Sequence, residues 1–135
     1  MNIVVDTSVW SLLLRREKRN EENAFLKRLR YHLQREDTIH LVGLVLQEIL
    51  DGIKQQKQFD LLVEYLEPFP LIQCTRTDFI TAARLKNTCR NKGVQASSVD
   101  FLIASVCVNR KYLLLTSDKD FSRIAEHCPL ILDQL

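Results

Sequence analysis

Residues 2–10, Asn-Ile-Val-Val-Asp-Thr-Ser-Val-Trp, place an acidic residue directly after a short apolar run. Ile3, Val4 and Val5 are apolar at every position, which is typical of a parallel strand buried on both faces. A helix is expected from Ser8 onward, so Asp6 lies where a strand ends and a helix begins. Open parallel α/β sheets bind their ligands at this edge. The stretch therefore predicts the first strand of such a sheet, with a carboxylate at its ligand-binding edge.

The remainder of the chain alternates between strand-like and helix-like segments. Apolar runs predict further strands at residues 39–42, 71–74, 112–116 and 130–132. Apolar positions at helical spacing predict helices at residues 20–34, 44–53, 59–66, 78–89, 99–108 and 118–126, with Thr77 or Asp78 capping the fourth and Ser97 or Ser98 opening the fifth. In the first of these helices the apolar face is predicted to consist of Phe25, Leu26, Leu29 and Leu33. Strands that alternate with helices imply right-handed crossovers. We expect a three-layer α/β/α domain with a central, mostly parallel sheet of four or five strands.

Length and composition predict one globular domain over residues 1–135. Hydrophobic residues make up 46% and charged residues 27%, an ordinary globular balance. The net charge of +2 does not by itself indicate a nucleic-acid partner. A basic cluster at residues 15–19 is either a solvated helix end or a contact for RNA phosphate.

The sequence also predicts a cytoplasmic protein with reduced thiols. No apolar run approaches the roughly 18–20 residues that a membrane-spanning helix needs, and the first residues contain no signal-peptide core. The four cysteines, Cys74, Cys89, Cys107 and Cys128, include no C-x-x-C pair. We therefore expect structural thiols and no association with a membrane.

Three further acidic residues stand in apolar surroundings. They are Glu48 in L-V-L-Q-E-I-L, Asp100 in S-S-V-D-F-L-I-A and Asp118 in L-L-T-S-D-K-D-F. Helix capping is an alternative explanation for Asp6 and Asp118 at their strand-to-helix junctions. It also explains Asp100, which stands three residues after Ser97 as in a capping box. For Glu48 the alternative is a solvent-facing glutamate.

Converging carboxylates would require a cation. Two carboxylates 4 Å apart repel by about 4 kcal/mol at an effective dielectric of about 20. One of them would take up a proton unless a divalent ion relieved the repulsion. Carboxylate oxygens are the ligands that Mg²⁺ and Mn²⁺ prefer, and water activated by such an ion can attack a phosphodiester. The chain has no G-x-x-x-x-G-K-[ST], H-E-x-x-H or G-x-S-x-G motif that would indicate another chemistry.

The order of the acidic motifs resembles that of the PIN domain, and most closely that of the VapC-type toxins of toxin–antitoxin modules. The motifs D-T-S-V-W, Q-E-I-L-D-G-I, S-S-V-D-F-L-I-A and L-L-T-S-D-K-D-F span residues 6–121, so the resemblance covers almost the whole chain. It implies a PIN-like fold and a Mg²⁺- or Mn²⁺-dependent endoribonuclease toxin. It also implies structured RNA as the substrate and a cognate antitoxin as the inhibitor.

The resemblance implies roles for particular residues. Asp6, Asp100 and Asp118 correspond to the metal-binding aspartates of the family, and Glu48 corresponds to its helix-borne catalytic glutamate. Three further residues correspond to supporting positions, namely Ser8, Thr116 and Asp120. The chain departs from the family at Gly43-Leu44, where relatives often carry a Ser or Thr cap before the glutamate helix.

Two other functions compete with this interpretation. A haloacid-dehalogenase-like phosphatase needs a second acid two positions after the first, where this chain has Ser8. A PIN-fold module that binds RNA or a partner without cutting is the second alternative.

The resemblance also implies a homodimer and an antitoxin segment beside the acidic pocket. The antitoxin is expected to contribute an arginine that pairs with the acids or displaces the metal. Such partners would cover an apolar surface of the protein. The candidate residues for that surface are Trp10, Leu13, Leu14, Phe59, Leu62 and Leu66.

Overall fold

The computed structural model describes residues 1–14 and 23–134, so the basic cluster at residues 15–19 lies outside the described residues. Strands and helices alternate as the sequence predicts. In chain order they are β1 (Asn2–Val5), α1 (Thr7–Leu14), α2 (Ala24–Gln34), β2 (Thr38–Val42), α3 (Gly43–Leu50), α4 (Gln56–Leu66), β3 (Leu71–Ile72), α5 (Arg76–Asn91), α6 (Ser98–Arg110), β4 (Leu113–Leu115) and α7 (Lys119–Ala125).

The four strands form a parallel sheet in the order β3-β2-β1-β4. Ile3 of β1 lies opposite Ile39 of β2 on one side and Leu113 of β4 on the other. The chain winds outward from β1 to β2 and β3, and then crosses to β4 on the other side of β1. The winding direction therefore reverses between β1 and β4. In open α/β sheets, ligands bind at such a reversal, beyond the carboxyl ends of the strands.

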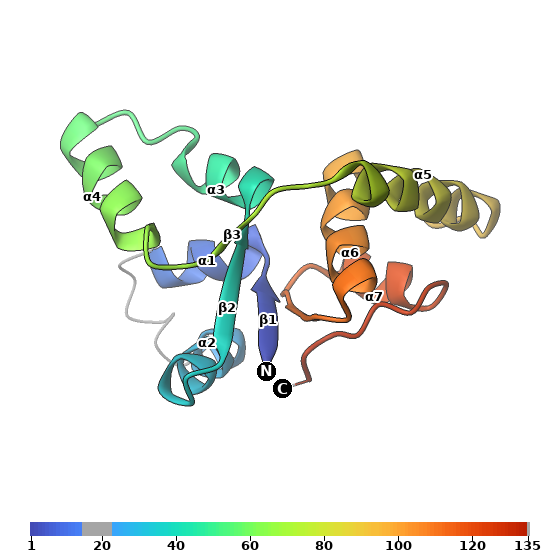
Figure 1. Cartoon of the computed structure of the whole chain (residues 1–135), viewed down its shortest axis with the longest axis horizontal. Coiled ribbons are helices and arrows are strands. Elements are labelled where there is room, and N and C mark those ends of the chain that lie inside the picture. Colours follow the sequence, from blue (N-terminus) through green and yellow to red (C-terminus); the bar gives the residue numbers. More distant parts are fainter. Residues whose placement is uncertain (15–22, 135) are drawn as a thin grey trace.

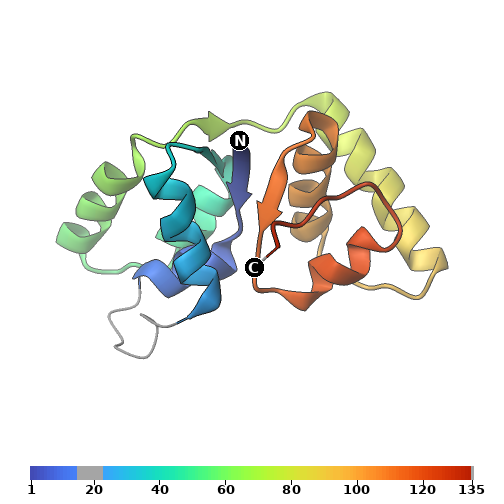
Figure 2. The ribbon, with the colours of Figure 1, turned by 90° about the horizontal axis from the view of Figure 1, so that it is seen from below.

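Helices cover both faces of the sheet. Figures 1 and 2 show α1 to α4 on one side of the strands and α5 to α7 on the other. Right-handed crossovers that wind in opposite directions place their helices on opposite faces, which explains this division. The predicted three-layer α/β/α architecture with a parallel sheet is confirmed.

Helix α6 is the most deeply buried helix of the second layer. All of residues 101–107 are buried, and the helix contacts α5, α7 and β4. Ser97 is its N-cap, as one of the two predicted alternatives has it, and Lys111 closes it with a left-handed φ of 59°. Because its core-facing side chains fix the helix, the acidic residue in its first turn is placed accurately.

Two buried aspartates pair with arginines from distant segments. Asp78 of α5, which is 1% exposed, accepts two hydrogen bonds from Arg110 at 2.9 and 3.0 Å. Burial alone would raise the pKa of Asp78, but hydrogen bonds from Arg110, the Thr75 backbone and Asn109 hold it well below its usual range. The pair joins the start of α5 to the end of α6.

The second pair, Arg28 with Asp133, joins α2 to the C-terminal segment through two 2.9 Å hydrogen bonds. Fully buried His32 lies between Asp133, at 2.6 Å, and Asp37, at 2.8 Å. Burial would raise the pKa of Asp133, but Arg28 and His32 lower it below its ordinary value.

The strand expected at residues 130–132 is reduced to one parallel bridge. Leu132 pairs with Leu114 of β4, and the flanking bonds run from the Leu114 N–H to the Ile131 carbonyl at 3.0 Å and from the Asp133 N–H to the Leu114 carbonyl at 2.8 Å. The segment extends the sheet beyond β4 by a single residue pair, within the predicted range of four or five strands.

Two local predictions are wrong. The N-cap of α5 is Thr75 rather than Thr77 or Asp78, because Thr75 and Asp78 exchange the two hydrogen bonds of a capping box. Leu33 was expected on the apolar face of α2 but is 41% exposed, and His32 takes the buried position with its two aspartate partners. Within the described part of the chain, no helix is long and apolar enough to cross a membrane.

Candidate active site

Asp6 directly follows β1 and is only 6% exposed. Its Oδ2 atom accepts a hydrogen bond from the Ser8 hydroxyl at 2.8 Å and another from the Thr116 hydroxyl at 3.0 Å. The Ser8 backbone N–H contributes a longer bond of 3.4 Å. Hydroxyl donors satisfy a buried carboxylate without adding a positive charge. The Asp6 carboxylate is thus held in place by neutral groups.

The same two hydroxyls join the strand ends at which the winding reverses. The Ser8 hydroxyl oxygen accepts from the Ser117 N–H at 3.1 Å, and the Thr116 hydroxyl oxygen accepts from the Asp118 N–H at 3.0 Å. The two hydroxyl oxygens lie 3.4 Å apart. Hydrogen bonds therefore run directly from the end of β1 to the end of β4, and both supporting hydroxyls named by the resemblance lie against Asp6.

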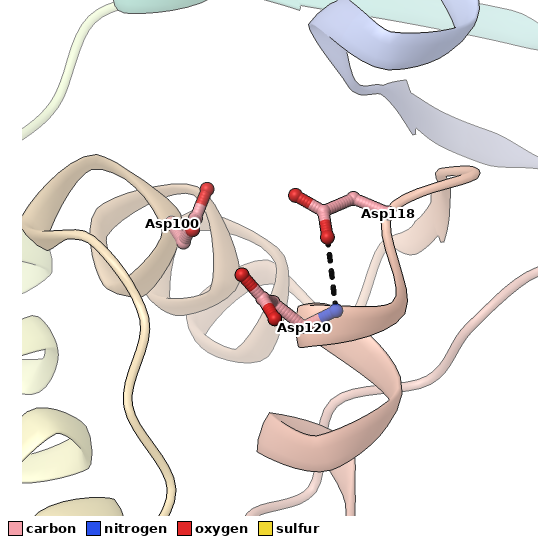
Figure 3. A group of neighbouring side chains, drawn as sticks. All are labelled: Asp100, Asp118 and Asp120. Carbon is pink, nitrogen blue, oxygen red and sulfur yellow. Dashed lines mark hydrogen bonds between the residues drawn. The ribbon is translucent and has the colours of Figure 1, made fainter.

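Three aspartates come together beside this junction (Figure 3). One carboxylate oxygen from each of Asp100, Asp118 and Asp120 lies within 4.8 Å of the others. Around an octahedral Mg²⁺ with oxygens about 2.1 Å away, adjacent ligand oxygens are about 3 Å apart and opposite ones about 4.2 Å. The three oxygens therefore fit such an ion after a closing movement of less than about 2 Å.

These aspartates also cap helices. Asp118 is the N-cap of α7, and its Oδ1 accepts from the Asp120 N–H at 2.9 Å. Asp100 exchanges two bonds with Ser97 in a capping box, at 3.1 and 3.2 Å. The capping explanation is thus correct for both residues. Because a carboxylate has two oxygens, capping leaves one of them to bind a cation.

The pKa of Asp100 is raised, by burial and in part by the carboxylates that lie close to it. Burial raises the pKa of this carboxyl group, and the carboxylates of Asp118 and Asp6 raise it further, against the lowering effect of the hydrogen bonds from Ser97. Arg123 lies 3.6 Å from Asp120, but its side chain is 62% exposed, and exposed ion pairs contribute little. Most of the repulsion is therefore left for another cation to relieve.

Glu48 approaches the aspartates from α3. Its Oε1 accepts a hydrogen bond from the Thr7 hydroxyl at 3.1 Å. Burial raises the pKa of Glu48, the Thr7 hydrogen bond lowers it, and the carboxylates of Asp6 and Asp100 raise it. Glu48 therefore lies close enough to Asp6 and Asp100 to be affected by their charges, although its side chain is exposed.

Sequence reasoning singled out Ser8 but missed Thr7. Both hydroxyls follow Asp6 in the D-T-S motif, so each could have been examined as a partner for a carboxylate. The partner of Thr7 stands 41 positions away on another helix, which the motif does not reveal.

The tightest group differs from the three metal ligands that the resemblance implies, because it contains Asp120 in place of Asp6. The hydrogen bonds from Ser8 and Thr116 hold the Asp6 carboxylate back at the end of β1. Asp120 lies in the first turn of α7 and turns toward Asp100 of α6. Asp6 and Glu48 border this group without belonging to it.

A groove of about 770 Å³ opens beside Glu48. Residues of α1, α3 and α4 line it, including Leu14, Ile49, Leu61, Leu62 and Tyr65, with Glu48 and Asp51 as its acidic members. Its walls are mostly apolar.

Comparisons with known proteins agree with this fold. The family described as the PIN domain matches residues 3–127. Similar solved structures include VapBC2 from Rickettsia felis bound to a DNA fragment from their promoter, with a TM-score of 0.79, 21% identity, and coverage of 100% of this chain and 99% of that chain. VapBC-1 from nontypeable Haemophilus influenzae has a TM-score of 0.78 and 19% identity, and covers 99% of this chain and 98% of its own.

A third structure is Mycobacterium tuberculosis VapC20, a Sarcin-Ricin loop cleaving toxin, with a TM-score of 0.65, 16% identity, and coverage of 89% of this chain and 92% of that chain. The search among curated protein sequences found no significant match. At these identities the solved structures show a shared fold. The family match extends over nearly the whole sequence, and the chain therefore belongs to the PIN domain family.

Proposed function

We propose that this protein is a metal-dependent endoribonuclease that cleaves structured RNA and acts as the toxin of a toxin–antitoxin module. The observation that carries the proposal is the group of Asp100, Asp118 and Asp120, with Asp6 and Glu48 beside it. Membership of the PIN family supports nuclease activity. VapC20, which shares the fold, is described as a toxin that cleaves the Sarcin-Ricin loop, and this supports RNA as the substrate.

Each acid has a distinct part in the proposed reaction. Asp100, Asp118 and Asp120 offer oxygen ligands to Mg²⁺ or Mn²⁺, and Asp6 adds negative charge next to them. The bound ion would supply activated water and neutralise charge on the phosphate. Glu48 is suited to accept a proton from that water, because its raised pKa brings it closer to neutral pH.

A cleavage assay with carboxylate-to-amide variants tests this function. We expect RNA cleavage that requires Mg²⁺ or Mn²⁺ and falls by about 10²-fold or more in Asp100→Asn and Asp118→Asn. Asp60→Asn is the matched control, since Asp60 is an exposed acid on α4. Full activity in excess EDTA would rule out the metal. RNA binding without cleavage would identify a non-cleaving RNA-binding module instead.

The groove beside Glu48 is our proposed site for an antitoxin segment. Its apolar walls suit an amphipathic helix, and Glu48 and Asp51 suit an arginine, which binds carboxylates through two parallel hydrogen bonds. The solved VapBC neighbours support a protein partner of this kind. Leu61→Glu should prevent inhibition by the cognate antitoxin. Val63→Glu, an exposed apolar position of α4 outside the groove lining, should not.

A homodimer is proposed with a different surface from the one expected. Trp10 and Leu66 are buried inside the protomer and cannot form an interface, and Leu14 and Leu62 line the groove. The start of α5 exposes two neighbouring apolar side chains, Phe79 at 56% and Ile80 at 47%. We therefore assign the dimer contact to the start of α5, around Phe79 and Ile80.

A further inference from the structure

Two successive hydroxyls after β1 serve two different carboxylates. Thr7 is the first residue of α1, and its hydroxyl donates to Glu48 of α3 at 3.1 Å. The next residue, Ser8, donates instead to Asp6 at 2.8 Å. Through these two hydroxyls the first residues of α1 bind both Glu48 of α3 and Asp6, which directly follows β1.

Within the described residues, few other contacts hold the Glu48 side chain. Helix α3 begins at Gly43, and its N-cap, Val42, makes no side-chain capping bond. The Glu48 side chain is exposed, and among the described residues the Thr7 hydroxyl is its hydrogen-bond donor. An exposed, unbranched glutamate has several rotamers available, so this bond selects among them.

The electrostatic forces on Glu48 make such a support necessary. The carboxylates of Asp6 and Asp100 repel it, which favours rotamers that turn away from the site into water. A lysine or arginine could hold Glu48, but its charge would compete with a metal ion for the acids. A hydroxyl holds the carboxylate and leaves its negative charge intact.

We propose that Thr7 is a positioning residue that keeps the Glu48 carboxylate directed toward the group of Asp100, Asp118 and Asp120. Thr7 acts through Glu48 and not on the substrate. The inference rests on the proposed function for its effect on cleavage, and on geometry alone for its effect on the Glu48 side chain.

Two substitutions separate the hydroxyl of Thr7 from its shape. Thr7→Val keeps the branched side chain and removes the hydroxyl, whereas Thr7→Ser keeps the hydroxyl. We expect Thr7→Val to lower kcat by about 10- to 100-fold with KM for RNA unchanged, because a catalytic group displaced by about 1 Å costs up to about that factor. Thr7→Ser should stay within about threefold of the wild type. Thr88→Val, at an exposed position of α5, is the control for a threonine-to-valine change.

A double-variant cycle tests whether Thr7 acts through Glu48. If it does, adding Thr7→Val to Glu48→Gln should leave the residual kcat unchanged. Equal losses in Thr7→Val and Thr7→Ser, or an undiminished effect of Thr7→Val in the Glu48→Gln background, would overturn the proposal.

A second measurement needs no nuclease activity. Carbon-13 relaxation of the Glu48 side chain in the metal-free protein should show greater mobility in Thr7→Val than in the wild type or in Thr7→Ser. Unchanged mobility in Thr7→Val would refute the positioning role even if the protein cleaves RNA. Absence of cleavage by the wild type would refute the proposed function, and the relaxation experiment would still decide the role of Thr7.

Discussion

Asp100→Asn is expected to stabilise the metal-free protein while it abolishes cleavage. Asp100 shares the acidic group with Asp118 and Asp120, so removing its charge removes two of the repulsive pairs. Asparagine keeps a side-chain oxygen that can accept the Ser97 N–H bond of the capping box. The substitution therefore changes charge with little change in local structure.

The separation of the oxygens sets the size of the effect. The oxygens lie within 4.8 Å of one another, and at that upper limit two unit charges repel by about 3.5 kcal/mol at an effective dielectric of about 20 and by about 0.9 kcal/mol in bulk water. The site is half-buried, and the raised pKa of Asp100, caused first by burial, means that its charge is already disfavoured. We expect a net gain of about 1–2 kcal/mol in the free energy of unfolding, or a rise of about 3–8 °C in melting temperature.

Thermal unfolding in EDTA and in Mg²⁺ measures this gain. In EDTA, Asp100→Asn should unfold at a higher temperature than the wild type. With Mg²⁺ the wild type should gain more than the variant, because the stability that a ligand adds to the folded state increases with the logarithm of its affinity. Asp60→Asn should change neither result. A destabilised Asp100→Asn in EDTA, or an equal gain from Mg²⁺ in both proteins, would refute the view that these acids repel and share a cation.

Three further predictions concern other parts of the fold. Arg110→Met should lower the free energy of unfolding by about 3 kcal/mol, because it leaves the buried Asp78 carboxylate without its cation. The lowered pKa of Asp78 stabilises the wild type above the ordinary carboxyl range, so the difference measured by urea unfolding should shrink as the pH falls below about 4. Lys111→Gly should raise stability by about 1 kcal/mol by relieving a left-handed φ, whereas Lys92→Gly, at a φ of −102°, should not. Phe79→Asp should convert a dimer to a monomer in light scattering, and a dimer that persists in this variant would exclude the α5 surface.

The order of elements could be predicted because it depends on local patterns. The start of α5 shows where such prediction fails. The stretch T-R-T-D contains two threonines before Asp78, and only Thr75 stands at the three-residue spacing that a capping box requires. On α2, periodicity favoured Leu33 as a buried residue. His32 is buried instead because Asp133, 101 residues away, bonds its ring, and no local pattern contains that information.

Prediction of the site was limited for the same reason. The motifs identify which acids follow strands or begin helices. They do not give the distances between the carboxylates of these acids in the folded protein. Hydrogen bonds from Ser8 and Thr116 keep the Asp6 carboxylate at the end of β1. Asp120, in the first turn of α7, lies close to Asp100 and Asp118 instead. The membership of the tightest group therefore depends on distances between strands and helices that only the fold establishes.

Asp78 and Asp133 differ in their partners from the acids of the candidate site, and the difference is an argument for function. Asp78 and Asp133 each have an arginine in bidentate contact, and both have lowered pKa values despite burial that would raise them. Asp6 and Glu48 are held by neutral hydroxyls, and burial and neighbouring carboxylates raise the pKa of Glu48 and Asp100. The fold therefore has the means to neutralise an acid with an arginine, and it uses them away from the strand ends. Within the described residues, the only ion pair to Asp100, Asp118 or Asp120 is the contact between Asp120 and the exposed Arg123. This arrangement at the reversal of the sheet supports the proposal that these carboxylates bind a cation.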